Sequence, residues 1–170
     1  MAKTTLWTTL LVLFLGLFES TVLANISYFN FTPDLVLIVV LYISFFNGSL
    51  FGEVNGFIAG LIIDFLSAAP LGLNTFIRTI HGFVYGLFKG TVNIDKVFFP
   101  FLLGFTSTIF KAFITWLLSL FYSGLVSNYN FFSYQFWIEC GINGLFTPIV
   151  FLFLNFFPDF ISNKQDLENV

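Results

Sequence analysis

The sequence predicts an all-α polytopic integral membrane protein, built as a six-helix transmembrane bundle in one domain. The first reason is composition: of 170 residues, 58% are hydrophobic and only 9% are charged. A soluble domain carries about 25% charged residues. Because so few charged side chains cannot cover a water-soluble surface, the chain is expected to lie in a membrane, surrounded by lipid.

The second reason is the spacing of the apolar stretches. About 20 helical residues cross the hydrocarbon core of a bilayer. The second stretch is short for this purpose, whereas the fifth and sixth are long enough to tilt. Residues 158–170 form a short polar tail. The six predicted spans are residues 5–24, 33–47, 50–68, 72–90, 97–122 and 132–157.

The first two apolar stretches carry further sequence signals at their ends. Lys3, the apolar run after it and "TVLA" before Asn25 are also typical of a cleaved signal peptide. The long apolar region, with Glu19 near its end, favours retention as the first helix. The second stretch begins with Thr32-Pro33-Asp34, which predicts an N-cap, a first-turn proline and an acid favoured by the helix dipole.

The placement of lysine predicts the orientation. Lys3, Lys89, Lys96 and Lys164 flank the first span, the 91–96 loop and the sixth span, whereas the loops at 25–32, 67–71 and 123–131 contain no Lys or Arg. Basic residues accumulate on the cytoplasmic side. Both termini, with the tail, and the 91–96 loop are therefore expected in the cytoplasm, and the three loops without basic residues are expected outside.

The third and fourth spans carry small residues at helical spacing. Gly52, Gly56, Gly60 and Asp64 follow one another at intervals of four, so they share one helix face. The fourth span repeats the pattern with Asn74, Arg78, Gly82, Gly86 and Gly90. Such stripes let two helices approach closely in lipid. Gly52, Gly56, Gly60, Gly82 and Gly86 are expected to serve helix packing or to form a groove for a partner.

The charged side chains near this hairpin form a predicted outer polar cluster. A charge at the centre of a spanning helix costs roughly 2.5–3.5 kcal/mol. Asp64 and Arg78 are therefore expected to pair across the hairpin, either as a structural ion pair or as part of a pocket or docking surface open to the outside. The predicted cluster contains Asp34, Asp64, Asn74, Arg78 and His81.

The fifth and sixth spans place a second pair of charges in the bilayer. Folding the chain about residue 127 brings Lys111 opposite Asn143, and its long side chain can reach Glu139 one turn away. Lys111 lies deep in its span and needs a partner. Within the spans, Asp64 and Glu139 would then balance Arg78 and Lys111, which favours internal pairing over an ion path.

Several function classes find no support in the sequence. The net charge is −3 with six Lys and Arg, so no basic patch for a nucleic acid is expected. One cysteine, Cys140, cannot form an intrachain disulfide, and no second His or Cys stands at metal-ligand spacing from His81. The sequence contains no nucleophile elbow, phosphate-binding loop or zinc-protease motif. No enzyme activity, cofactor or metal is expected.

Residues 33–90 resemble the rod shape-determining protein MreD. The likeness is carried by "PDLVLIVVLYISFFNGSLFGEVNGFIAGLIIDFLSAAPLGLNTF", with Pro33-Asp34, a glycine-rich helix ending in Asp64, and "PLGLNTF" from Pro70 to Phe76. The resemblance implies a non-enzymatic protein of the bacterial inner membrane. It also implies a fold similar to the substrate-binding subunits of energy-coupling-factor transporters.

Two functions from different classes follow. By the resemblance, the chain is a multi-pass scaffold of the cell-elongation machinery, which builds peptidoglycan. It would bind the transmembrane helix of MreC and, through it, act with MreB, a SEDS glycan polymerase and a penicillin-binding transpeptidase. Alternatively, the outer polar cluster binds a small solute, and the chain is a transporter subunit. The short external loops and the family likeness favour the scaffold.

Overall fold

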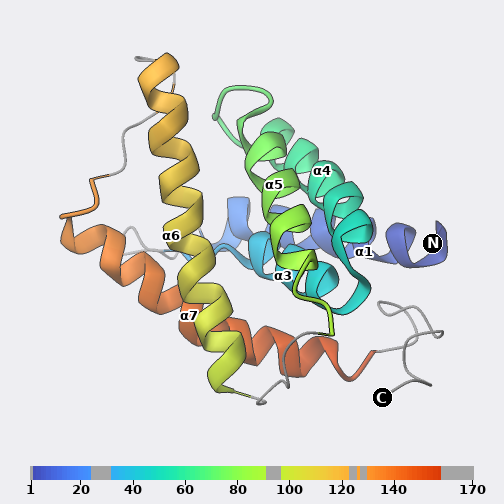
Figure 1. Cartoon of the computed structure of the whole chain (residues 1–170). Coiled ribbons are helices and arrows are strands. Elements are labelled where there is room, and N and C mark those ends of the chain that lie inside the picture. The colour runs from blue at the N-terminus through green and yellow to red at the C-terminus, as the bar shows by residue number, and fades with distance from the viewer. Residues whose placement is uncertain (1, 24–31, 91–96, 123–125, 127–129, 158–170) are drawn as a thin grey trace.

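The computed structural model describes residues 2–23, 32–90, 97–122, 126 and 130–157, and these residues are almost entirely helical (Figure 1). Helix α1 continues into a short π-helix, η1, and five further helices follow. Their bounds are α1 Ala2–Phe18, η1 Glu19–Leu23, α3 Leu35–Asn47, α4 Ser49–Leu66, α5 Leu73–Gly86, α6 Phe98–Phe121 and α7 Tyr134–Leu154. The expected all-helical class is confirmed over this part of the chain.

Among the described residues, four helical segments are long and apolar enough to cross a membrane: Thr4–Thr21, Ser49–Leu66, Phe98–Phe121 and Tyr134–Leu154. The other two predicted spans are too short to do so alone. Helix α3 has 13 residues and α5 has 14, which gives each a length of about 20 Å at 1.5 Å per residue. The sequence predicted a fourth span reaching residue 90, but α5 ends at Gly86 and residues 87–90 form turns. The predicted tail at 158–170 lies outside the described residues.

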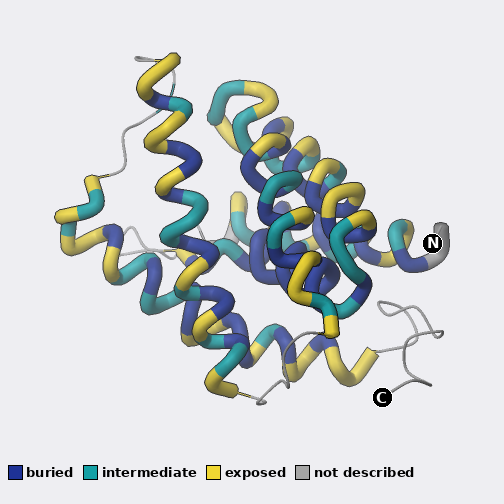
Figure 2. The backbone as a smooth tube through the Cα atoms, in the orientation of Figure 1, coloured by how far each residue is buried: buried dark blue, intermediate teal, exposed yellow. Residues whose placement is uncertain are grey.

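Helix α3 is the centre of the fold. Its residues from Leu35 to Phe45 are all buried, with exposed fractions between 0% and 9%. Figure 2 shows α3 as a dark blue segment inside the molecule. A helix that is apolar around its whole circumference is buried either inside a protein or in the bilayer. Here helices α1, α4, α5, α6 and α7 enclose α3.

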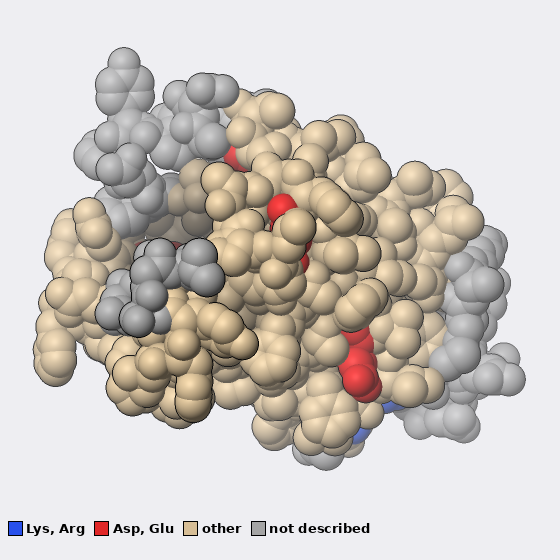
Figure 3. Space-filling model, turned by 90° about the horizontal axis from the view of Figure 1, so that it is seen from above, with Lys and Arg blue, Asp and Glu red and all other residues tan. Residues whose placement is uncertain are grey.

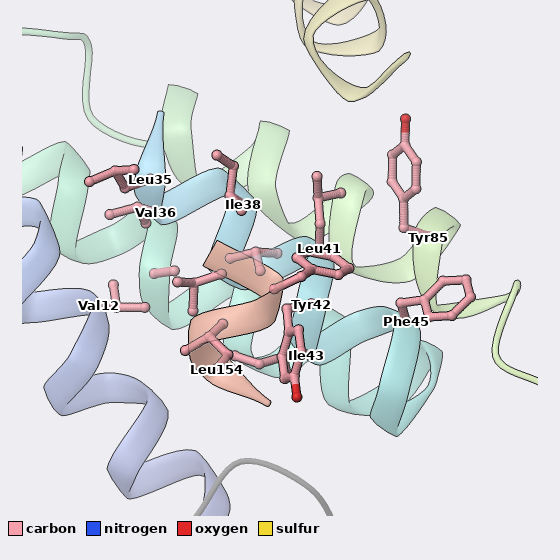
Figure 4. Close-up of a cluster of buried hydrophobic side chains, with 14 of the residues drawn as sticks. Val12, Leu35, Val36, Ile38, Leu41, Tyr42, Ile43, Phe45, Tyr85 and Leu154 are labelled. Carbon is pink, nitrogen blue, oxygen red and sulfur yellow. The ribbon is translucent and has the colours of Figure 1, made fainter. Parts of the chain in front are cut away.

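The main core forms around α3. Val12 of α1 and Leu154 of α7 lie beside the α3 side chains in Figure 4. Tyr85 of α5 belongs to the same cluster, with its hydroxyl pointing away from α3 and bonded to Thr106 of α6. Tyr42 lies edge-on to Phe151 of α7, with ring centroids 5.1 Å apart. One short helix therefore joins most of the bundle.

The glycine stripes lie in the contact between α4 and α5. A Cβ atom added to Gly52 would collide with the backbone of Gly82, and one added to Gly60 would collide with the backbone at Asn74 and Thr75. Gly56 faces the Arg78 carbonyl in the same way, and Gly86 faces Ser49. The chain's own helices therefore fill all five glycine faces. The packing interpretation fits this arrangement, and the open glycine groove for a partner does not.

Helices α6 and α7 cross each other and form a second unit of packing (Figure 1). Gly104 of α6 lies against Thr147 and the Asn143 carbonyl of α7. Ala112, Phe136 and Cys140 form a small apolar cluster between the two helices, separate from the main core.

Candidate functional site

Asp34 is the hub of a buried polar network. It is the N-cap of α3, and its Oδ1 accepts a hydrogen bond of 2.9 Å from the Leu37 N–H. Its own N–H donates to Asn143 Oδ1 of α7 at 2.8 Å. The sequence placed the N-cap at Thr32, two residues too early. A carboxylate at this position is favoured by the unpaired N–H groups and the dipole of the helix N-terminus.

Two cations from different helices bind Asp34. Arg78 Nη2 of α5 lies 2.8 Å from Asp34 Oδ1, and Lys111 Nζ of α6 lies 2.9 Å from Asp34 Oδ2. Lys111 also contacts Glu139 Oε1 of α7 at 3.2 Å, so the predicted Lys111–Glu139 pair is confirmed. The predicted pairing of Asp64 with Arg78 is wrong, because the Arg78 guanidinium binds Asp34.

Asp64 instead binds the N-terminus of α5. Its two carboxylate oxygens accept hydrogen bonds from the backbone N–H groups of Gly72, Asn74 and Thr75 at 2.9–3.0 Å. The Thr75 hydroxyl donates a fourth bond of 2.6 Å. Helix N-termini are natural sites for an anion, since they combine free N–H donors with the positive end of the dipole. Asp64 therefore needs no cation to be stable here.

Asn74 joins Asp64 to the rest of the network. Its side-chain Oδ1 accepts a 2.6 Å hydrogen bond from Arg78 Nη1, one turn further along α5. Asp34, Asp64, Asn74 and Arg78 are therefore brought together as predicted, in a different order of contacts. Arg78 is only 3% exposed and lies between the two acid-bearing helix ends.

His81 lies apart from these four residues. Its Nδ1 is 2.7 Å from the Ile77 carbonyl of its own helix, and its Nε2 is 3.0 Å from the Ser107 carbonyl of α6. The ring is fully buried and stacks on Tyr85, with Phe110 on α6 close by. The structure therefore assigns His81 to the contact between α5 and α6.

Glu19 and Asn143 also belong to the network, although the predicted outer polar cluster contained neither of them. Glu19 Oε1, at the start of η1, accepts a 3.1 Å hydrogen bond from the Val36 N–H of α3. Asn143 donates to Thr108 Oγ1 at 2.9 Å, in addition to its bond with Asp34. The register between α6 and α7 thus differs by about one turn from the prediction that set Lys111 opposite Asn143. An acid inside an apolar run was the available signal for Glu19.

The network contains more acids than bases. Within the part of the chain that the structure describes, Glu19, Asp34, Asp64 and Glu139 face two cations, Arg78 and Lys111, whereas the sequence count gave two of each. Three of the acids are stabilised by helix N-termini, Glu19 and Asp34 at α3 and Asp64 at α5. Little of this charge reaches the surface seen in Figure 3, where acidic and basic atoms form small, separate patches.

The comparison with known proteins decides the family. The sequence model of the family described as rod shape-determining protein MreD matches residues 1–157 of the 170-residue chain. The chain belongs to the MreD family. No curated protein and no solved structure matches the chain. The expected likeness to substrate-binding subunits of energy-coupling-factor transporters therefore stays a prediction.

Membership of the MreD family and the four long apolar helices make this a membrane protein associated with rod shape determination. Among the residues that the structure describes, no group of three or more His, Cys, Asp or Glu side chains could hold a metal ion. The network's described contacts are hydrogen bonds and ion pairs that connect helices of the same chain.

Two hollows lie along α5 and α6, and both have largely apolar walls. One has a volume of about 390 Å³ and lies between the start of α5 and the end of α6. The other, of about 450 Å³, lies between the end of α5 and the first half of α6. None of the five residues of the predicted outer polar cluster lines either hollow. The polar cluster and the described hollows are separate features.

Proposed function

We propose that this member of the MreD family is a non-enzymatic scaffold of the bacterial cell-elongation machinery. In this proposal it lies in the inner membrane, binds MreC and helps to organise the enzymes that build peptidoglycan. The family match over residues 1–157 is the observation that carries the proposal. MreB, the SEDS glycan polymerase and the penicillin-binding transpeptidase are reached indirectly, through MreC.

The polar network supports a scaffold because its contacts hold helices together. Asp34 connects α3 with α5, α6 and α7, Asp64 connects α4 with α5, and Glu19 connects η1 with α3. Charged side chains in a bilayer mark either a transport path or a structural bond. Here each acid accepts hydrogen bonds from a neighbouring helix or its cap, which favours the structural bond.

The proposed orientation follows from the basic residues. Lys3, Lys89, Lys96 and Lys164 would face the cytoplasm together with both termini. Asp64 and the turn after α4 would then lie toward the outer side. We call this end of the bundle, which carries the turn at 67–71, the outer end, and we call the opposite end the inner end.

The partner would contact lipid-facing apolar side chains, since the chain fills its own glycine faces. Large apolar residues are exposed along α1, α4, α6 and α7. A single transmembrane helix of MreC could pack on such a face through van der Waals contact, which drives helix association in lipid.

Affinity purification of a tagged full-length chain from native membranes in mild detergent tests this function. We expect MreC and the two cell-wall synthases to be recovered with it and identified by mass spectrometry. The same membranes with an untagged chain give the background. Recovery of the folded protein without MreC, but with a pair of coupling ATPases or a bound small solute, would replace the scaffold by the transporter subunit.

A further inference from the structure

Helices α6 and α7 are bonded to each other over much of their length. Gly104 allows α7 to approach closely, and Asn143 bonds to Thr108. Lys111 bonds to Glu139, and the apolar cluster around Cys140 lies just beyond. These contacts combine backbone approach, a buried amide and an ion pair. The two helices therefore form one structural unit.

The contacts of this unit with the main core are strongest toward the inner end. Phe99 at the start of α6 lies 5.3 Å from Phe45 of α3, measured between ring centroids. Phe151 near the end of α7 packs on Tyr42, whose hydroxyl donates a 2.7 Å hydrogen bond to Asn155 Oδ1. Close apolar packing joins the α6–α7 unit to α3 in this half of the molecule.

Toward the outer end the same unit separates from the core. The end of α6 and the start of α5 enclose the hollow of about 390 Å³. Figure 1 shows the upper end of α6 apart from α4 and α5. The walls of this hollow include Leu73 and Phe76 on α5 and Leu118 on α6.

Between these two regions, α5 holds α6 through the contact of 3.0 Å between His81 Nε2 and the Ser107 carbonyl and through the bond from the Tyr85 hydroxyl to Thr106. Helix α3 holds both helices of the unit through polar bonds to one residue, Asp34. The Asp34 latch consists of the Lys111–Asp34 ion pair at 2.9 Å and the hydrogen bond from the Asp34 N–H to Asn143 at 2.8 Å. One bond comes from α6 and the other from α7, so both helices of the unit are fixed to the same point on α3. In lipid, apolar burial gives little force to close a gap between helices. The latch therefore carries much of the attachment of the unit to α3 beyond the inner contacts.

We propose that α6 and α7 form a hinged arm that pivots on its inner contacts with α3 and is held closed by the Asp34 latch. Opening of the latch moves the outer end of α6 away from α5 and widens the hollow between them. The Lys111–Glu139 bond stays intact in this motion because both residues belong to the arm. The proposal concerns the chain alone and does not depend on the identity of its partner.

Distances between pairs of spin labels, measured by double electron–electron resonance in lipid vesicles, test the hinge. The background is the full chain with Cys140→Ala, which removes its single cysteine. The outer pair is Phe65→Cys on α4 with Leu120→Cys on α6, and the inner pair is Leu50→Cys on α4 with Phe98→Cys on α6. All four residues are exposed.

Without further changes, we expect the outer pair to give a broader distance distribution than the inner pair. Lys111→Met removes the ion pair of the latch and leaves the bond to Asn143, so it weakens the latch and should shift the outer distribution to longer distances while leaving the inner one in place. The matched control is Glu139→Gln, which keeps the Lys111–Asp34 bond and should leave both distributions close to the background.

Two results would overturn the hinge. One is an outer distribution that is as narrow as the inner one and unchanged by Lys111→Met. The other is an equal change in both pairs, which indicates general loosening of the bundle. If Lys111→Met does not fold, the comparison of the outer and inner widths in the background protein still decides between a hinged arm and a rigid bundle.

Discussion

Replacing Gly56 with alanine tests how closely α4 and α5 are packed. The new methyl carbon would lie 2.9 Å from the carbonyl carbon of Arg78 and 3.3 Å from the Cα of Thr79. Carbon atoms in contact prefer a separation of about 3.5–4.0 Å. Both neighbouring groups belong to the backbone and cannot rotate away. The two helices must therefore move apart along their whole contact.

The magnitude follows from two opposing effects. Overpacking a close contact costs about 1–3 kcal/mol, and a clash with backbone places Gly56→Ala near the upper value. Alanine is also about 1 kcal/mol more favourable than glycine inside a helix. We therefore expect the free energy of unfolding to fall by about 2 kcal/mol.

Gly141 in α7 is the matched control. A Cβ atom added there meets no other atom within 4 Å, so Gly141→Ala should gain the helix preference of about 1 kcal/mol without a clash. The two variants should differ by about 3 kcal/mol, which corresponds to about 6–12 °C in melting temperature for a chain of this size. Thermal unfolding in mild detergent, followed by tryptophan fluorescence, measures the difference. Equal melting temperatures, or a higher one for Gly56→Ala, would refute the predicted backbone contact.

Three further predictions concern the polar contacts. Asp64→Asn should lower the free energy of unfolding by about 1–2 kcal/mol and speed amide hydrogen exchange in the first turn of α5, because the cap loses its charge. Unchanged exchange would contradict the capping role of Asp64. Lys111→Met should lower the free energy of unfolding by about 3 kcal/mol, because it removes the cation that Asp34 and Glu139 share. Adding Glu139→Gln should recover part of the lost melting temperature, and no recovery would argue against the Lys111–Glu139 pair. Tyr42→Phe removes the hydrogen bond to Asn155 and should lower the free energy of unfolding by about 1 kcal/mol, seen as a melting temperature lower by about 2–4 °C. An unchanged melting temperature would show that this bond does not contribute to stability.

The local features of the fold were predictable from spacing. Glycine at every fourth position of the third span marks one helix face, and the short turn after Asp64 forces an antiparallel neighbour. These two facts give the α4–α5 contact without further information. The Lys111–Glu139 pair follows in the same way from a hairpin of two long helices. Periodicity works here because the partners lie on consecutive helices.

The hub at Asp34 was not predictable as a hub by this reasoning. Its cations are 44 and 77 positions away in the chain, on helices that are not its immediate successors. Spacing within one helix carries no information on such contacts, which depend on α3 lying inside the ring of the other helices. The same limit applies to Glu19, whose partner is the backbone of Val36. A hydrogen bond to backbone leaves no pattern in the side chains.

The overestimated length of α5 has a local cause. The residues after Gly86 include Leu87 and Phe88, so the apolar stretch continues where the helix has already ended. Gly90, which has a φ of 71°, closes the turn in the left-handed region that favours glycine. Hydropathy measures apolar character and does not mark the end of a helix, which backbone geometry determines.

The enclosed helix α3 has a consequence for how the chain enters the membrane during synthesis. Its 13 residues, about 20 Å long, are about 10 Å short of a bilayer's hydrocarbon thickness, so this segment is a poor candidate for insertion by itself. Its polar end at Asp34 would also lie in hydrocarbon until Arg78 and Lys111 had been synthesised. Gly48 alone separates α3 from α4, which favours entry of the two helices together. On this view α3 is inserted as part of a hairpin, and the order of the helices in the chain determines when its buried charge is neutralised.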